Sequence, residues 1–385
     1  MGDAIVHRTN ARSGLFGNPS DQYHGRCITF SLANFYAEVT LTPGPEPGIR
    51  IQPHPVHDST EWGSMDELLS RTSTQGLYGG VRLLTAACKR FAEYCRDHGV
   101  RLEPPASRKG MGFTLSYETT VPRQTGMAGS SAIIYSTIKC LLDWYGLGPE
   151  DLPYAARPGL ILSVEAGELG INAGLQDRVI QVYGGLVHLD FDAAHMKAHG
   201  GAGRYTRLDP ALLPPLHIMY SENPSESGKV HSGVKARWMA GDPEVRALMT
   251  RVAQCGDEGL RLLTARGQAA DGAEADRGEK RVHLEGDARE ADGVSTQDRA
   301  LADLMTANFR LRHALFGDEV LGARNLRMVE LAKSAGAGVN FTGSGGATVV
   351  FCPRGRQQAE ELRAAAEAEG FVLVEAVIGP ETAPL

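Results

Sequence analysis

The sequence lacks features that mark several large classes of protein. No apolar stretch approaches the roughly 20 residues that cross a bilayer, and the start, MGDAIVHRTN, has no apolar signal core. We therefore expect a cytoplasmic protein with no membrane partner. The formal net charge is -7, and no segment interleaves Lys or Arg with aromatic residues, which excludes a nucleic-acid partner.

Cysteine is scarce as well, at 6 of 385 residues, and no two cysteines form a C-x-x-C pair. Scattered thiols in so long a chain argue against a disulfide framework and a structural zinc. Apolar residues are plentiful, at 42% against 22% charged, which is the composition of an ordinary globular protein. One hydrophobic core rarely suffices at this length, so we expect two lobes. The oligomeric state is left open.

Alternating segments predict strands in the first half of the chain. Apolar and polar residues alternate over residues 26–41, with a change of phase at residues 33 and 34 that indicates a bulge, and again over residues 113–121. Apolar residues then recur at helical spacing over residues 134–145, and Gly146 is typical of a helix C-cap. The order is strand, glycine-rich loop, helix.

The rest of the chain predicts a mixture of helices and strands. Further signals lie at residues 77–94, 149–169, 216–220, 347–351, 357–369 and 371–374. The helical pattern over 149–169 is broken around Pro158-Gly159. Residues 265–297 contain scarcely any large apolar residue, so we expect a disordered or loosely helical surface insertion there.

The most informative segment is PRQTGMAGSSA, residues 122–132, at the start of the expected helix. Its glycines let backbone N–H groups approach an anion, and the N-terminus of a helix favours negative charge. The adjacent hydroxyls of Ser130 and Ser131 suit a Mg²⁺ that bridges phosphates. The segment therefore predicts a phosphate site, although by itself it also fits a tight turn with a serine N-cap.

With two other segments, this loop resembles the GHMP kinase superfamily. Residues 12–23, RSGLFGNPSDQY, are similar to the family's first motif, in which an early Arg or Lys and a later Asp flank a turn facing the acceptor. The glycine loop is similar to the second motif. Residues 342–347, TGSGGA, resemble the third, which lies beside the phosphates. All three occur in the family's order.

The resemblance implies a two-lobed α+β fold with the active site between the lobes. It implies an N-terminal α/β lobe over residues 1–203 and a C-terminal α+β, ferredoxin-like lobe over residues 204–385. The glycine-rich residues 199–203 fit a crossing between them. The same resemblance implies ATP and Mg²⁺ as cofactors. The residues it places around the ATP phosphates are Pro122, Gly126, Met127, Ala128, Gly129, Ser130, Ser131, Gly343, Ser344 and Gly345.

A fourth segment, AGLQD at residues 173–177, resembles the Cys-Gly-x-x-Asp run of the galactokinase branch. The match implies that Asp177 is the catalytic base for the acceptor hydroxyl and that Arg12 keeps Asp177 ionised. Seen alone, Asp177 is equally a helix N-cap.

The metal ligands implied by the resemblance are Ser131 and Glu165. Ala128 is one residue more than the family's second motif has, so Ser130 remains an alternative to Ser131. In isolation, Glu165 fits a solvated helix face.

Longer stretches resemble the glucuronokinase group of the superfamily: residues 17–26, 173–191 and 220–238. They imply a small-molecule substrate, D-glucuronate, phosphorylated at its anomeric hydroxyl. The alternatives are another sugar kinase of this superfamily, of galactokinase, arabinokinase or fucokinase type, and a non-catalytic sugar sensor.

A sugar acid needs a cation for its carboxylate and amides or carboxylates for its hydroxyls. The side chains assigned to the substrate are Asn18, Asp21, Tyr23 and Lys229. The cations considered for the carboxylate are Arg12, Arg123, Lys229, His231 and Arg237. A Lys or Arg taken singly is usually just solvated.

Overall fold

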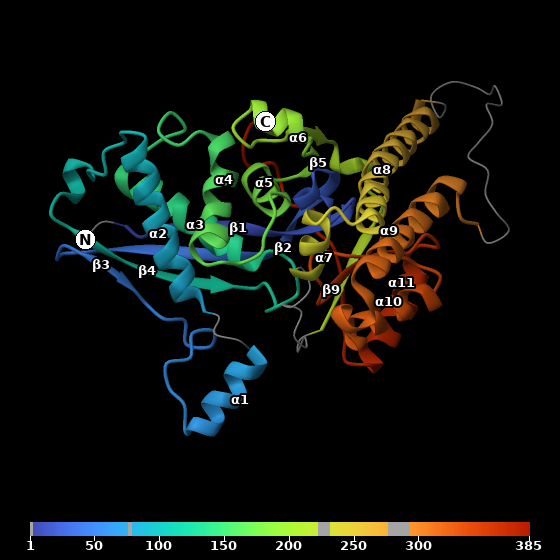
Figure 1. The fold of residues 1–385 in the computed structure, drawn as a ribbon, viewed down its shortest axis with the longest axis horizontal. Helices are drawn as coiled ribbons and strands as arrows, with labels where there is room; N and C mark the ends of the chain where they lie inside the picture. The colour runs from blue at the N-terminus through green and yellow to red at the C-terminus, as the bar shows by residue number, and fades with distance from the viewer. Residues whose placement is uncertain (1–2, 76–78, 222–231, 276–292) are drawn as a thin grey trace.

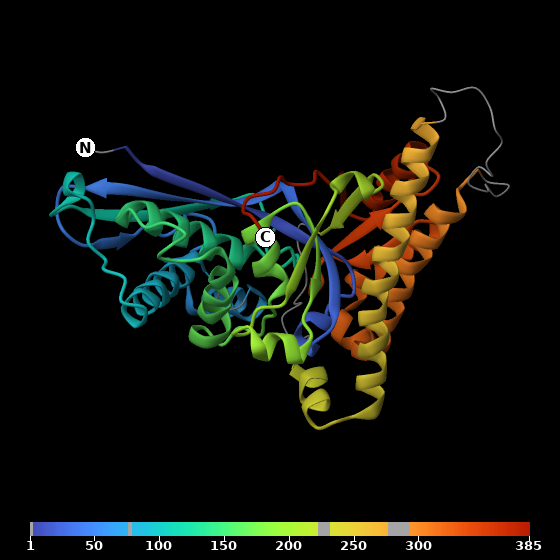
Figure 2. The same cartoon turned by 90° about the horizontal axis from the view of Figure 1, so that it is seen from above.

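The computed structural model describes residues 3–75, 79–221, 232–275 and 293–385. These residues form two lobes, each built on one sheet with its own helices (Figures 1 and 2). The expected two-lobed α+β fold is confirmed. Among the described residues, no helix combines the length and the apolar character needed to cross a bilayer.

The first sheet has six strands, in the order β3-β4-β2-β5-β6 with β1 also paired to β2. The strands are β1 (Ile5–Phe16), β2 (Arg26–Gly44), β3 (Ile49–Ile51), β4 (Gly112–Thr119), β5 (Leu186–Asp190) and β6 (Arg204–Leu208). The register of β1 on β2 jumps from Asn10 opposite Tyr36 to Ala11 opposite Leu32. The unpaired residues of β2 form the irregularity that the change of phase predicts at residues 33 and 34.

Helices α2 to α5 lie along one face of this sheet (Figure 2). The helices of the first lobe are α1 (Met65–Gln75), α2 (Gly80–Asp97), α3 (Gly129–Tyr145), α4 (Arg157–Leu162), α5 (Gln176–Tyr183) and α6 (Ala193–Ala198). Helix α3 ends as expected at Gly146, which has a φ of +68°. The expected break around Pro158-Gly159 corresponds to the boundary between a 3₁₀-helix at Tyr154–Ala156 and α4, and Pro158 stands in the first turn of α4, where its missing N–H leaves no helical bond unmade. The helix then widens into a π-helix at Ser163–Glu168.

The second sheet is antiparallel, in the order β10-β7-β9-β8. Its strands are β7 (Leu216–Tyr220), β8 (Gly338–Phe341), β9 (Ala347–Phe351) and β10 (Val372–Glu375). Helices connect β7 to β8 and β9 to β10, which is the ferredoxin-like arrangement. These helices are α7 (Ser232–Met239), α8 (Pro243–Ala275), α9 (Thr296–Leu321), α10 (Ala323–Ser334) and α11 (Arg356–Ala368). Helices α8 and α9 lie side by side (Figures 1 and 2).

The two ends of the expected insertion at residues 265–297 are regular helix rather than loose chain. Helix α8 continues to Ala275, and α9 begins at Thr296. Arg266 donates to a carboxylate oxygen of Asp298 at 3.1 Å and to the carbonyl oxygen of Leu212 at 3.2 Å. Polar contacts thus hold the part of α8 that composition alone marked as unable to pack. Residues 276–292 lie outside the described residues.

The expected lobe boundary at residue 203 comes before β6, and β6 pairs with β5 in the first sheet. The chain also returns to the first lobe at its end, through bridges between Leu32 and Ile378 and between Gly184 and Glu381. We therefore propose that the boundary lies between β6 and β7 and that the last residues belong to the first lobe.

Candidate active site

The two glycine loops of the sequence pack backbone against backbone. Gly126 has a φ of +63°, and a Cβ there would lie 2.7 Å from the carbonyl oxygen of Gly345. A Cβ on Gly343 would lie 2.0 Å from the carbonyl oxygen of Gly126. Side chains would force these loops apart, so glycine is required at both positions. The second and third sequence motifs therefore form one structural unit at the N-terminus of α3.

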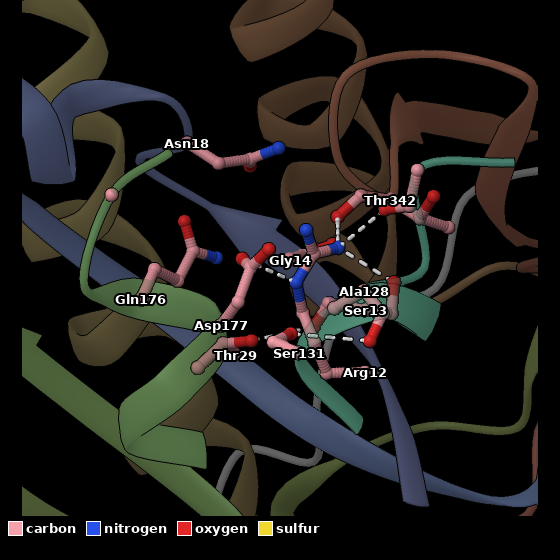
Figure 3. A network of polar contacts seen from close by, with 12 residues as sticks. Arg12, Ser13, Gly14, Asn18, Thr29, Ala128, Ser131, Gln176, Asp177 and Thr342 are labelled. Carbon is pink, nitrogen blue, oxygen red and sulfur yellow. Dashed lines mark hydrogen bonds and ion pairs between the residues drawn. The ribbon is translucent and has the colours of Figure 1, made fainter. Parts of the chain in front are cut away.

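Arg12 joins both loops to Asp177, as Figure 3 shows. Its Nη1 donates to the carbonyl oxygens of Gly126 at 2.7 Å and Thr342 at 2.6 Å, and its Nε donates to Asp177 Oδ1 at 2.6 Å. The guanidinium lies on β1 and is buried, while Asp177 lies in the first turn of α5. Four segments distant in sequence meet at this side chain. The structure thus brings together the pair expected to carry the chemistry.

Arg178 is a residue of this site that the sequence analysis missed. Its Nη1 lies 3.2 Å from Asp177 Oδ2, and its Nε donates to Glu165 Oε2 at 2.7 Å. Arg178 and Glu165 are both buried, and a second guanidinium nitrogen also contacts Oε2. Nothing in the sequence marks this arginine, because α5 (QDRVIQVY) mixes polar and apolar residues. Taken singly, that position would be assigned to solvent.

The structure pairs Glu165 with Ser130 rather than with the expected Ser131. Ser130 Oγ donates to Glu165 Oε1 at 2.7 Å, whereas Ser131 Oγ donates to the carbonyl oxygen of Ala128 at 3.2 Å. Ala128 has a φ of +64° and caps α3. This cap directs Ser130 toward Glu165 and turns Ser131 into the core, where it is fully buried. The contact with Glu165 favours Ser130, the alternative that the extra loop residue left open.

Asp21 lies against the turn that leads into α5. Its Oδ2 accepts a hydrogen bond from the backbone N–H of Gln176 at 3.3 Å, and a Cβ on Gly174 would lie 1.9 Å from the same oxygen. Burial, and next the charge of Asp177, raise the pKa of Asp21 to about 6. The two motif carboxylates are therefore close enough for the charge of Asp177 to act on Asp21.

This pKa predicts an acid limb in the activity. An ionised Asp21 can only accept hydrogen bonds from sugar hydroxyls, and protonation removes an acceptor. We expect kcat/KM for the sugar to fall as the pH drops through about 6, with the carboxylate form active above it. Asp21→Asn should lower activity overall and flatten this limb in a pH profile. An unchanged limb in Asp21→Asn would assign the titration to another group.

Asn18 and Tyr23 are more enclosed than a substrate-binding role suggests. Asn18 Nδ2 donates to the carbonyl oxygen of Phe341 at 2.9 Å, and Oδ1 accepts from Asn340 at 3.2 Å. The amide thus ties the first motif to β8, so the expectation that it reads a sugar hydroxyl is not supported. Tyr23 packs edge-on against Trp238 at 5.1 Å, and its hydroxyl makes no hydrogen bond within the described part of the chain. Burial, and next Asp21, raise the pKa of Tyr23 to about 12.

Besides Arg12, which binds Asp177, the cations considered for the substrate carboxylate divide into three groups. Lys229 and His231 lie outside the described residues. Arg237 is wrong as a free cation, because it pairs with Asp242 at 2.7 Å and Glu244 at 2.9 Å at the surface. Arg123 lines a cavity of about 730 Å³ whose wall also includes Trp62 and Val81. This cavity adjoins the start of the glycine loop.

Comparison with known proteins identifies the family. Residues 82–185 match the GHMP kinases N terminal domain. The chain is 45% identical to glucuronokinase 1 of Arabidopsis thaliana over 98% of this chain and 93% of that protein. The chain belongs to the GHMP kinase family. Probable glucuronokinase 2 of the same plant is also 45% identical, over 95% of this GHMP kinase and 89% of its relative.

Solved GHMP kinases have the same fold as this one. Lactococcus lactis galactokinase, solved with galactose, superposes with a TM-score of 0.67 at 15% identity, covering 98% of this chain and 94% of that chain. Methanococcus jannaschii mevalonate kinase gives 0.65 at 17% identity, with 98% and 99% covered. Family membership confirms a kinase, with ATP as the phosphoryl donor and a small-molecule sugar as the acceptor.

Proposed function

We propose that this GHMP kinase transfers the γ-phosphoryl group of ATP to the anomeric hydroxyl of D-glucuronate. The observation that carries the proposal is the 45% identity to glucuronokinases over almost the whole chain. The ion pair between Arg12 and Asp177 where the three motifs meet supports catalysis rather than passive sugar binding. A sugar sensor has no use for a base held beside a phosphate loop.

The phosphates of ATP are assigned to the paired glycine loops. Backbone N–H groups of residues 122–131 and 343–345 would approach the phosphates, and the N-terminus of α3, a helix of 17 residues, favours the negative charge. The cavity beside Arg123 is large enough for the base of the nucleotide and has apolar wall on which the base can pack. The nucleotide would then extend from this cavity to the loops.

Asp177 is assigned as the base that takes the proton of the anomeric hydroxyl. As the oxygen of that hydroxyl forms its bond to the γ-phosphorus, the bond from phosphorus to the β,γ-bridging oxygen breaks and ADP leaves. Arg12 favours the ionised carboxylate and offsets charge that develops on the transferring group. Most of the rate then comes from positioning and charge compensation.

Ser130 and Glu165 are the residues that would hold Mg²⁺. A hydroxyl and a carboxylate 2.7 Å apart beside a phosphate loop supply the oxygen ligands that Mg²⁺ takes together with phosphate oxygens. When bound, the ion would offset phosphate charge. Arg178 binds Glu165 Oε2, which leaves Oε1, the oxygen beside Ser130, to bind the ion.

ATP should raise the melting temperature only when Mg²⁺ is present. Ser130→Ala should increase the Mg²⁺ concentration that this effect requires by about 10-fold or more, because one metal ligand is lost. Ser131→Ala is the matched control and should leave that concentration unchanged. The measurement is the melting temperature with ATP across a Mg²⁺ titration. The opposite ranking of the two variants would restore Ser131 as the ligand.

The acceptor is tested by ADP release over uronic acids and neutral sugars. We expect D-glucuronate to be preferred over D-glucose and D-galactose by roughly 100-fold or more in kcat/KM, because a site built for a carboxylate leaves its cation unpaired with a neutral sugar. A higher kcat/KM with galactose or arabinose would show that glucuronate is the wrong acceptor, while the assignment as a sugar kinase would stand. If no sugar stimulates ADP release, the sensor becomes the better account.

A further inference from the structure

Arg312 on α9 is a buried cation that makes no ion pair with any residue the structure describes. Its side chain is fully buried, and none of its three guanidinium nitrogens makes a hydrogen bond within the described part of the chain. Two aromatic rings lie beside the guanidinium, with Cζ 5.3 Å from the ring centre of Phe341 and 5.6 Å from that of Phe316. Burying a charge this way is costly unless something pairs with it.

The position of Arg312 is fixed by its neighbour one turn earlier in α9. Asn308 accepts from the backbone N–H of Gly17 at 2.7 Å and donates to the carbonyl oxygen of Asn18 at 3.2 Å. Residues four apart lie on the same face of a helix, so Arg312 faces the first sequence motif as Asn308 does. Phe341, beneath the guanidinium, in turn accepts from Asn18.

The charges of Arg12 and Asp21 both act on Arg312. Burial, and next the like charge of Arg12, lower the pKa of Arg312 to about 9, while Asp21 opposes this shift. Arg312 therefore remains a cation at neutral pH and feels both the catalytic arginine and the carboxylate assigned to sugar hydroxyls.

Two other buried polar atoms near Asp21 also lack hydrogen-bond partners among the described residues. They are the hydroxyl of Tyr23 and the side-chain nitrogen of Gln176, whose backbone N–H already binds Asp21. Buried polar atoms are rarely left unsatisfied, and several around one point suggest that a ligand completes them. A ligand bearing both hydroxyls and an anionic group matches these donors.

The other arginines in this region are already used. Arg12 binds Asp177 and two loop carbonyls, and Arg178 binds Glu165. Arg312 is the cation of this group that has its whole planar fork of donors available, and that fork matches the two oxygens of a carboxylate.

We propose that Arg312 binds the carboxylate of the sugar acid and thereby selects it over the neutral sugar. This inference rests on the proposed function and names the residue that sets its acceptor. A neutral sugar would leave the guanidinium buried and unpaired, which is the penalty that separates the two substrates.

The test compares Arg312→Met, Arg312→Lys and Arg310→Met with D-glucuronate and D-glucose. Arg312→Met should lower kcat/KM for glucuronate by roughly 100-fold or more and leave that for glucose within a few-fold, so that the preference collapses. Arg312→Lys keeps the charge without the planar fork and should be intermediate. Arg310 is exposed on the same helix, so Arg310→Met should match the parent chain.

Folding does not confound this test. Methionine in place of an unpaired buried charge should leave the melting temperature unchanged or raise it. A large fall in melting temperature, or a folded Arg312→Met that still prefers glucuronate, overturns the role of Arg312 while the proposed function stands. If the parent chain fails to phosphorylate glucuronate, the proposed function fails, and the change in melting temperature on adding glucuronate then tests Arg312 alone. A rise in melting temperature that is lost in Arg312→Met supports the carboxylate site. No rise in the parent chain overturns the carboxylate site as well.

Discussion

Asp177→Asn should lower kcat by at least roughly 100-fold, the lower end for loss of a general base. The amide has nearly the same shape and can still accept a hydrogen bond from Arg12, but it cannot take the proton of the acceptor hydroxyl. The backbone of the glycine loops is untouched, so ATP should still raise the melting temperature. Turnover with saturating ATP and sugar, measured by ADP release, gives the effect.

The control for this substitution is Asp303→Asn, which makes the same change at an exposed position of α9. That variant should match the parent chain. Near-normal turnover in a folded Asp177→Asn protein would remove Asp177 from the chemistry and leave Arg12 as a residue that only ties the loops together.

Arg178→Met should cost about 3–5 kcal/mol of the free energy of unfolding, because it leaves the Glu165 carboxylate buried without its cation. Substituting both partners, as Arg178→Met with Glu165→Leu, should recover most of the loss, since no uncompensated charge then remains. Urea unfolding without nucleotide measures stability apart from activity, which both variants are expected to lose.

Comparing the single variant with the double variant separates the effect of the unpaired charge from the effect of lost packing. A single variant as stable as the parent would mean that the carboxylate is reached by water or repaired by another cation. A double variant no more stable than the single one would show that Arg178 contributes through packing rather than through its charge.

Much of the fold follows from local patterns, because half-buried strands and helices must alternate polar and apolar residues. The bulge in β2 and the end of α3 at Gly146 are read this way. The far end of α8 is not, since composition registers apolar burial and not the polar contacts that Arg266 makes. Pro158 marks the start of α4, because a proline is tolerated in the first turn of a helix and not in its interior.

Some residues of the site can likewise be predicted from sequence motifs, and others are found only in the structure. Gly126, Arg12 and Asp177 carry their chemistry in sequence, and the structure brings them together. Ser130 rather than Ser131 contacts Glu165, at the start of a helix whose N-cap, Ala128, has a left-handed backbone. Arg178 and Arg312 were missed because nothing in a sequence distinguishes a buried arginine from a solvated one.

The identity of the product decides whether this GHMP kinase phosphorylates D-glucuronate at its anomeric hydroxyl. The purified chain, given ATP, Mg²⁺ and D-glucuronate, should release ADP and form an equal amount of a phosphate ester whose phosphorus couples to the anomeric carbon in NMR spectra. That result would place the phosphoryl group on the anomeric hydroxyl of the sugar acid. A phosphorus coupled to any other carbon, or no ester with glucuronate while a neutral sugar is phosphorylated, would contradict the account.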